Sequence, residues 1–232
     1  MYHRQARWAI VLFPLIFVAG CGMDGDSRTN PRQGRLFLDY RITGDETKDD
    51  VTVLIQFRKG GINGINQELL PPEQVQLDGE TLEPDSSRFT GIYYETELDV
   101  IRFTGNHIID FTDFNNNQLR QEFSYQPLKL LNSIPGFLPR ANILLHLEGL
   151  DSLDYVRVVL TDTSYTSQGI NKLDTIRGGK LTIHKYELEQ LKNGPIHLEI
   201  MRENEKAIKE GTRTIGRLGI YYRLSREFNL RD

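Results

Sequence analysis

The chain has 232 residues, 28 of them basic and 32 acidic, so its formal net charge at pH 7 is −4. Phosphate-backbone binding relies on clustered lysines and arginines, so this mildly acidic composition argues against a nucleic-acid partner. The chain has 1 cysteine, so no intrachain disulfide can support its fold.

The first 20 residues have the features of a cleaved export signal. Arg4 and Arg7 precede an apolar run from Trp8 to Gly20, which Pro14 interrupts. A membrane-spanning helix needs about 20 apolar residues, and this run is shorter. A charged start, a short apolar stretch and small residues at the end predict a secretory signal peptide over residues 1–20.

The signal ends in the tetrapeptide Val18-Ala19-Gly20-Cys21. It resembles the lipobox of bacterial lipoproteins: an aliphatic residue, two small residues and a cysteine. The resemblance implies cleavage between Gly20 and Cys21, diacylglycerol on the Cys21 thiol and an acyl chain on the new amino group. A plain signal peptide, or a core segment with a chance cysteine, remains the alternative. We expect no other cofactor.

Residues 21–34 would then be the lipidated cysteine and a tether, since GMDGDSRTNPRQG contains glycine, aspartate and proline without an apolar period. Asp24 and Asp26 loosely resemble the acidic stretch of surface-exported lipoproteins of Bacteroidota. No second apolar run reaches spanning length, so the predicted membrane contact is the lipid anchor alone. We expect an outer-membrane location in a bacterial envelope, facing either the periplasm or the cell surface.

After the tether, apolar residues alternate with polar ones, which predicts strands with one buried face. The clearest examples are residues 51–57, 143–147, 156–160, 196–200 and 218–224. Asp78-Gly79 and Gly178-Gly179 predict hairpin turns. Residues 185–194 (KYELEQLKNG) predict a short helix in which Leu188 and Leu191 face one way.

Many short strands with turns between them predict an all-β sandwich fold. Pro127, Pro135 and Pro139 mark a junction, because proline disrupts central strands. We therefore expect two β-sandwich domains, at 35–130 and 139–232. The second resembles the immunoglobulin-like modules that occur in tandem in Bacteroidota envelope lipoproteins, which implies two Ig-like domains in tandem.

No common catalytic motif is present: the sequence lacks G-x-S-x-G, H-E-x-x-H, a P-loop and a dinucleotide fingerprint. The stretch GNHIIDFTDFNNNQ gathers His107, Asp110 and Asp113. Asp113, Asn115 and Asn117 match the first three ligand positions of a calcium loop. Gln118 then replaces the required glycine, and Ser124 replaces the bidentate glutamate. We expect a β-hairpin here, with those three residues as weak metal candidates and no catalytic residue.

Other polar side chains give weaker hypotheses. His146, His184 and His197 lie in the polar phase of predicted strands and would bind a metal only if those strands were neighbours. Tyrosines could form a binding surface, although each Tyr-Tyr pair should send one ring inward; the candidates are Tyr93, Tyr94, Tyr155, Tyr165, Tyr221 and Tyr222. Residues 202–213 (RENEKAIKEGTR) predict a solvated hairpin tip or, alternatively, a partner-docking loop.

Taken together, these features favour a non-enzymatic lipoprotein with a binding, adhesion or assembly role at the envelope. An envelope protein or a glycan is the expected partner. The alternative is a glycan-binding or hydrolase subunit of a nutrient-uptake system. The predicted mature chain has no tryptophan to stack on a sugar, because Trp8 leaves with the signal.

The lipid anchor gives the first testable prediction. Replacing Cys21 with serine removes the only thiol that could carry diacylglycerol, so the variant should lose acyl labelling and leave the membrane fraction. Metabolic labelling with a fatty acid, followed by fractionation, measures both. A Cys21→Ser protein that still partitions with membranes would contradict the anchor.

Overall fold

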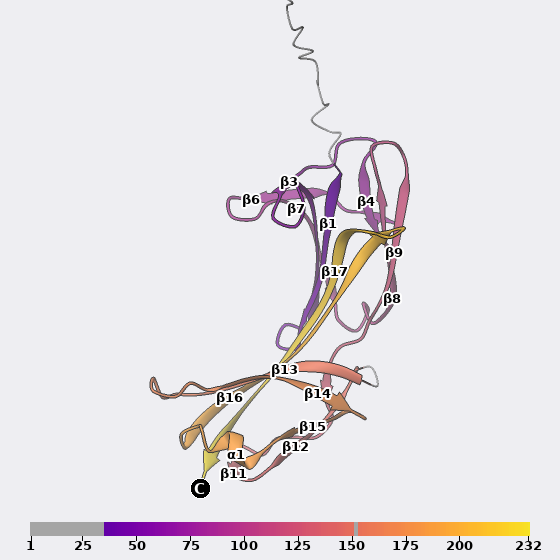
Figure 1. Cartoon of the computed structure of the whole chain (residues 1–232). Helices are drawn as coiled ribbons and strands as arrows, with labels where there is room; N and C mark the ends of the chain where they lie inside the picture. The colour runs from indigo at the N-terminus through magenta and orange to yellow at the C-terminus, as the bar shows by residue number, and fades with distance from the viewer. Residues whose placement is uncertain (1–34, 151–152) are drawn as a thin grey trace, which may run out of the picture. The chain divides into compact units, whose positions relative to one another are not determined.

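Strands account for almost all of the regular structure, as the alternation predicts. The computed structural model describes residues 35–150 and 153–232. Within those ranges it contains strands β1 to β17 and one helix of four residues (Figure 1). The predicted all-β class is confirmed. The predicted signal peptide and tether lie outside the described residues.

The larger of the two sheets has 13 strands, and we call it the long sheet. Its N-terminal part is built on β1 (Leu36–Asp45) and β2 (Asp50–Lys59), which pair antiparallel over their whole lengths. Beyond β2, the order continues through β7 (Gly91–Asp99) to β6 (Pro84–Ser87), while β3 (Ile65–Asn66) pairs with the end of β2. One face buries alternate residues of these strands, which include Leu38, Tyr40, Ile42, Val53, Ile55 and Phe57.

A four-stranded sheet packs against that buried face. Its order is β5 (Glu80–Thr81), β4 (Gln74–Leu77), β8 (Gly105–Thr112) and β9 (Gln118–Tyr125). The ring centroids of Phe57 on β2 and Phe111 on β8 lie 4.8 Å apart, which shows that the two sheets meet face to face. This is the two-layer packing expected of a sandwich.

The remaining strands extend the long sheet. They are β10 (Lys129–Leu130), β11 (Phe137–Pro139), β12 (Ile143–Glu148), β13 (Leu153–Asp162), β14 (Ile170–Arg177) and β15 (Lys180–Ile183). The helix α1 (Lys185–Leu188) follows β15 and starts the predicted helical stretch. Leu188 and Leu191 are both buried, as their spacing predicts. They belong to a core that includes Leu145, Val158, Leu181 and Leu198.

The C-terminal hairpin connects the two groups of strands. It consists of β16 (Gly194–Glu210) and β17 (Arg213–Arg231). Residues 196–202 of β16 pair with β13, whereas residues 216–223 of β17 pair in parallel with β1. The strand pairing thus crosses the predicted boundary between 130 and 139, and residues 34–232 cluster as one compact unit. The division into domains 35–130 and 139–232 stays a prediction.

The predicted turns agree with the backbone. Asp78 and Gly79 have φ values of 51° and 88° and join β4 to β5, while Gly178 and Gly179 join β14 to β15. The solvated hairpin tip predicted at residues 202–213 is present. Residues 202–210 belong to β16, because their alternation continues through buried Arg202 and Ile208, and only Gly211 and Thr212 lie between the strands.

The described part of the chain contains no helix with the length and apolar character needed to cross a membrane.

The contact between the sheets gives a stability prediction. A Cβ on Gly44 of β1 would lie 2.0 Å from the Tyr125 hydroxyl of β9 and 2.6 Å from the Tyr222 ring. Gly44→Ala should therefore lower the free energy of unfolding by about 1–3 kcal/mol through overpacking. Gly136→Ala is the control, because nothing lies within 4 Å of its Cβ position. Denaturant unfolding should separate the two variants; equal midpoints would show that this contact is unimportant.

Candidate functional site

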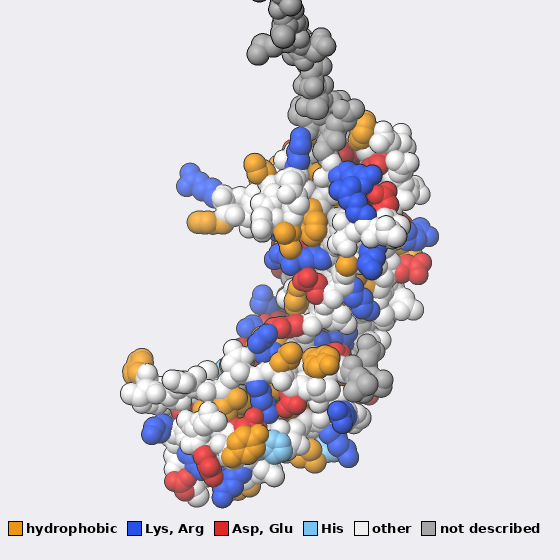
Figure 2. Space-filling view, in the orientation of Figure 1, with side chains coloured by type: hydrophobic (Ala, Val, Ile, Leu, Met, Phe, Trp, Pro, Cys, Tyr) orange, Lys and Arg blue, Asp and Glu red, His pale blue; other side chains and the backbone are white. Residues whose placement is uncertain are grey.

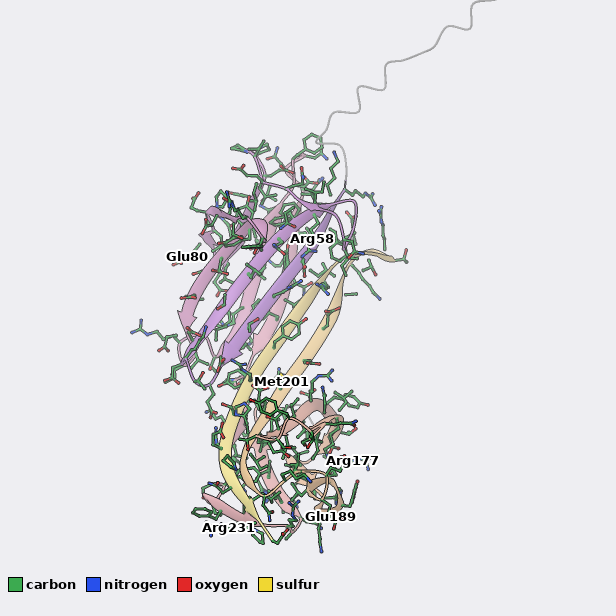
Figure 3. All side chains as sticks on the ribbon, turned by 90° about the vertical axis from the view of Figure 1, so that its left-hand side faces the viewer. Arg58, Glu80, Arg177, Glu189, Met201 and Arg231 are labelled. Atoms are coloured by element: carbon green, nitrogen blue, oxygen red, sulfur yellow. The ribbon has the colours of Figure 1, made fainter. Side chains whose placement is uncertain are left out.

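The outer face of the β1–β2–β17 sheet carries a buried carboxylate. Asp39 lies on β1 between Leu38 and Tyr40, which both point into the core. Alternation therefore directs Asp39 outward, to the face where polar residues normally meet water. Its exposed fraction is nevertheless only 1%. Side chains from neighbouring strands must cover it, and Figure 3 shows these strands with their side chains, Arg58 of β2 among them.

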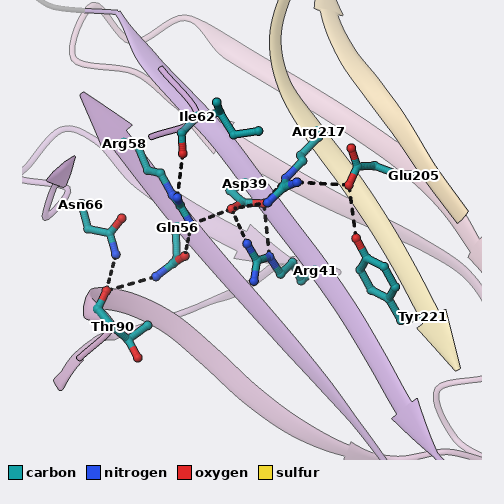
Figure 4. Close-up of polar contacts among 10 residues, drawn as sticks. All are labelled: Asp39, Arg41, Gln56, Arg58, Ile62, Asn66, Thr90, Glu205, Arg217 and Tyr221. Carbon is teal, nitrogen blue, oxygen red and sulfur yellow. Dashed lines mark hydrogen bonds and ion pairs between the residues drawn. The ribbon is translucent and has the colours of Figure 1, made fainter. Parts of the chain in front are cut away.

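Three arginines surround this carboxylate (Figure 4). Arg217 of β17 donates from Nε to Oδ1 at 2.8 Å and from Nη2 to Oδ2 at 3.2 Å. Arg58 of β2 donates to Oδ2 at 2.8 Å, and Arg41 of β1 donates to it at 3.0 Å. The register explains the convergence, because Asp39 pairs with Arg217 on one side and with Gln56 on the other. We call Asp39, Arg41, Arg58 and Arg217 the arginine cluster.

The arginines set the ionisation state of Asp39. Burial acts to raise the pKa of Asp39, but hydrogen bonds and charges from Arg217 and Arg41 outweigh it and hold that pKa below its ordinary value. The hydrogen bond to Asp39 in turn raises the pKa of Arg217. Asp39 is therefore a carboxylate at neutral pH, and its oxygens are occupied by guanidinium donors.

The arginine cluster also holds two loops. Arg58 Nη1 donates to the Ile62 carbonyl at 2.7 Å, and its Nη2 donates to Gln56 Oε1 at 2.8 Å. The Gln56 amide donates to the Thr90 carbonyl, which also accepts from the Asn66 amide. We call residues 60–66 and 87–91 the loop pair. A chain of hydrogen bonds thus connects both of its loops to the buried carboxylate.

The loop pair presents apolar side chains to solvent. The exposed fractions of Ile62, Ile65 and Phe89 are 44%, 78% and 101%. Phe89 lies in the turn between β6 and β7, and Figure 2 shows hydrophobic and basic side chains together at the tip of that hairpin. Solvent-exposed apolar side chains on loops fixed by a sheet are typical of a binding surface.

The predicted hairpin at residues 105–125 is confirmed, since β8 and β9 pair antiparallel with Asn116 at a φ of 61°. Asp113 anchors the turn between them. Its Oδ1 accepts from the backbone amides of Asn115 and Asn117 at 2.8 Å, and its Oδ2 accepts from the Asn117 side chain at 2.9 Å. The spacing that resembles a calcium loop is therefore used here to form the turn.

His107, Asp110 and Asp113 do not converge. His107 is buried and stacks on Phe103 at 3.8 Å between ring centroids. Its Nδ1 lies 2.7 Å from Asp78 Oδ2, and its Nε2 lies 2.6 Å from the Phe103 carbonyl oxygen, to which it must donate. Asp110 instead accepts two hydrogen bonds from Arg120. His107 therefore packs in the core.

The other predicted metal candidates are separated by the strand order. His146 lies on β12 and His197 on β16, with β15, β14 and β13 between them, while His184 precedes α1 and stacks on Tyr186. Hydrogen bonds that His197 donates to Glu227 and Glu199 raise the pKa of His197. In the described part of the chain, no three His, Cys, Asp or Glu side chains gather as a possible metal site.

The predicted tyrosine pattern is confirmed in both Tyr-Tyr pairs. Tyr94 and Tyr222 are buried, whereas Tyr93 and Tyr221 are partly exposed on the outer face. Tyr221 donates to Glu205, which also pairs with Arg217 of the arginine cluster. Gly20 and Cys21, the predicted cleavage and lipidation residues, lie outside the described residues.

The chain matches no protein-family model and no curated protein. It is similar to solved structures at low identity. One is DIP-gamma IG1+IG2, at 9% identity over 84% of this chain and 93% of that chain, with a TM-score of 0.24. Another is a 1.5-MDa bacterial ice-binding adhesin, at 9% identity over 85% and 66%, with a TM-score of 0.27.

A third is the Yersinia pseudotuberculosis adhesin InvE, at 11% identity over 86% of this chain and 61% of that chain, with a TM-score of 0.22. These TM-scores are too low to give the chain a family or a function.

Asp39 was not among the residues that the sequence singled out. Its segment, LFLDYRIT, follows the ordinary alternation of a strand. One signal could have marked it. Asp39 and Arg41 stand two residues apart, as do Gln56 and Arg58 on the next strand, and residues two apart share a face. The third arginine, Arg217, could be placed only by knowing that β17 lies beside β1.

The arginine cluster predicts a pH-dependent stability. Asp39→Asn should lower the free energy of unfolding at pH 7 by about 2–3 kcal/mol, less than for a fully buried pair because water reaches the arginines. The Asp39 pKa is lower in the folded than in the unfolded state. Its contribution is therefore complete above the unfolded value of about 3.9 and is lost as the pH falls through the folded value.

The measurement is urea unfolding of wild type and variant between pH 7 and pH 2. The gap between the two should narrow below about pH 4. Glu97→Gln, at an exposed position of β7 in the same sheet, is the control and should change stability little. A gap that stays constant with pH would show that the Asp39 charge does not contribute.

Proposed function

We propose that this chain is an exported bacterial lipoprotein, held to the membrane through Cys21, that binds another envelope protein through its loop pair. The signal-like residues 1–20 and the lipobox residues Val18 to Cys21 support the anchor. The outer-face arrangement around Asp39 supports the binding role. The proposed role is non-catalytic, and the occupation of both Asp39 carboxylate oxygens by guanidinium donors supports it.

The observation that carries the binding role is the connection between the arginine cluster and the loop pair. Ordering an exposed loop costs conformational entropy of about 1–2 kcal/mol per residue. Hydrogen bonds from Arg58 to the Ile62 carbonyl, and from Gln56 and Asn66 to the Thr90 carbonyl, oppose that cost. Loops that are already ordered lose less entropy when a partner binds.

The side chains on the loop pair favour a protein partner over a glycan. Ile65 and Phe89 offer exposed aliphatic and aromatic surface, and Arg88 adds a positive charge. Protein interfaces commonly centre on aromatic and arginine side chains. Sugars, in contrast, require several converging hydrogen-bonding groups. We therefore propose a partner with an apolar recess bordered by acidic residues.

Site-specific photo-crosslinking in cells that export the protein tests this function. A photoreactive phenylalanine at position 89 or at position 65 should give the same crosslinked envelope protein. The control is position 186, where Tyr186 is comparably exposed but lies on α1. Phe89→Ser should weaken capture of that partner at least tenfold and leave the melting temperature unchanged, since the side chain is exposed.

The proposal fails if position 186 gives the adduct and positions 65 and 89 give none. It also fails if Phe89→Ser leaves capture of the crosslinked partner unchanged. Loss of capture accompanied by a lower melting temperature would show that the loop has a structural role instead.

A further inference from the structure

The strand β9 has one edge without a strand partner among the described residues. It closes the four-stranded sheet in the order β5–β4–β8–β9 and pairs with β8 over all of residues 118–125 (Figure 1). Its other edge opens on a groove of about 540 Å³, which residues 121–124 of β9 line together with Arg202 and Lys206 of β16 and Leu218 and Ile220 of β17. The strand contains no proline or glycine. A long, regular, unprotected edge can accept a strand from another chain.

One other free edge carries a charge that discourages such pairing. The end of β16, residues 203–210, pairs only with β17, and Lys206 lies there in the same phase as buried Ile208. A charge on the core-facing row is a known protection of sheet edges.

The core-facing row of β9 itself contains no charged residue, although Lys206 of β16 lines the same groove. It consists of Leu119, Gln121, Phe123 and Tyr125, of which Phe123 and Tyr125 are buried. The charges of the strand, Arg120 and Glu122, lie on the opposite row and are exposed. The strand β9 therefore lacks the inward-facing charge that the free end of β16 carries.

The sequence of β9 is complementary to itself. Residues 119–123 read Leu-Arg-Gln-Glu-Phe. When two copies run antiparallel about a twofold axis at Gln121, Arg120 faces Glu122 of the other copy and Leu119 faces Phe123. Opposite charges and apolar side chains are favourable cross-strand pairs. A twofold interface repeats each pair, so every favourable contact occurs twice.

We propose that the mature chain forms a homodimer in which β9 pairs antiparallel with β9 of a second copy, centred on Gln121. The four-stranded sheets of the two copies then join into one continuous eight-stranded sheet. Arg120 can serve this contact while keeping its bonds to Asp110, which use Nε and Nη2. A guanidinium has five N–H donors, so others remain for Glu122 of the second copy.

This surface differs from the one in the proposed function. The loop pair extends from β2, β3, β6 and β7 of the long sheet, whereas β9 ends the four-stranded sheet. The dimer does not require the proposed partner. It would give each assembly two copies of the loop pair, which raises avidity for a partner present in several copies.

The test uses unlipidated residues 22–232, which include the whole compact unit of residues 34–232. Sedimentation equilibrium should show a reversible monomer–dimer equilibrium. Glu122→Arg places the new arginine opposite Arg120 of the other copy, and the twofold axis repeats this pair of like charges. The substitution should therefore weaken self-association at least tenfold. Glu80→Arg is the matched control: it makes the same charge change at an exposed position of β5 and should leave association unchanged.

Cysteine crosslinking tests the register, because residues 22–232 contain no native cysteine. Gln121→Cys should form a disulfide-linked dimer on mild oxidation, since the two residues meet at the twofold axis. Gln118→Cys and Ser124→Cys should each stay monomeric alone, because residue 118 of one copy faces residue 124 of the other. A mixture of those two variants should crosslink.

Three outcomes would overturn the proposal. The chain could sediment as a monomer at all concentrations up to the millimolar range. It could form a dimer that Glu122→Arg weakens no more than Glu80→Arg does. Crosslinking could also be no faster at position 121 than at position 124, which would place the contact elsewhere.

Discussion

The carboxylate of Asp39 is the interaction on which the outer face of this protein depends. Three guanidinium groups approach it from β1, β2 and β17. One of them, that of Arg58, also donates a hydrogen bond to the Ile62 carbonyl of the loop pair. Without this carboxylate, three like charges would lie close together, and Glu205, which bonds to Arg217, would offset them in part. The same hydrogen bonds order the loop pair, so the stability of this face and its proposed function share one physical origin.

The hairpin β16–β17 makes that interaction possible and limits how the chain can fold. Asp39 and Arg217 are 178 residues apart in sequence, yet they face each other because β17 pairs in parallel with β1. Loop-closure entropy opposes such distant pairing until many contacts form together. The N-terminal strands therefore cannot complete their sheet, or bury Asp39 fully, before the C-terminal hairpin is in place.

Local patterns predicted the strands well and their partners poorly. Alternation located β2, β12, β13, β16 and β17, and Asp78-Gly79 marked a hairpin, because these signals depend on a few neighbouring residues. The proline-containing segment at 127–139 predicts a division between domains, which stays a prediction. The pairing of β17 with β1 across that segment could not be predicted, because it is set by contacts far apart in sequence. For the same reason Asp39 looked like any polar strand residue.

The central claim is that the carboxylate of Asp39 orders the loop pair through the arginine cluster. Hydrogen–deuterium exchange on Asp39→Asn, with Glu97→Gln as the control, tests it directly when read by peptides that cover residues 59–67 and 87–91. The account predicts that Asp39→Asn speeds exchange in both peptides, while a peptide from β12 and β15 keeps the wild-type rate. Unchanged exchange in the loop pair, or equal acceleration throughout the chain, would contradict it.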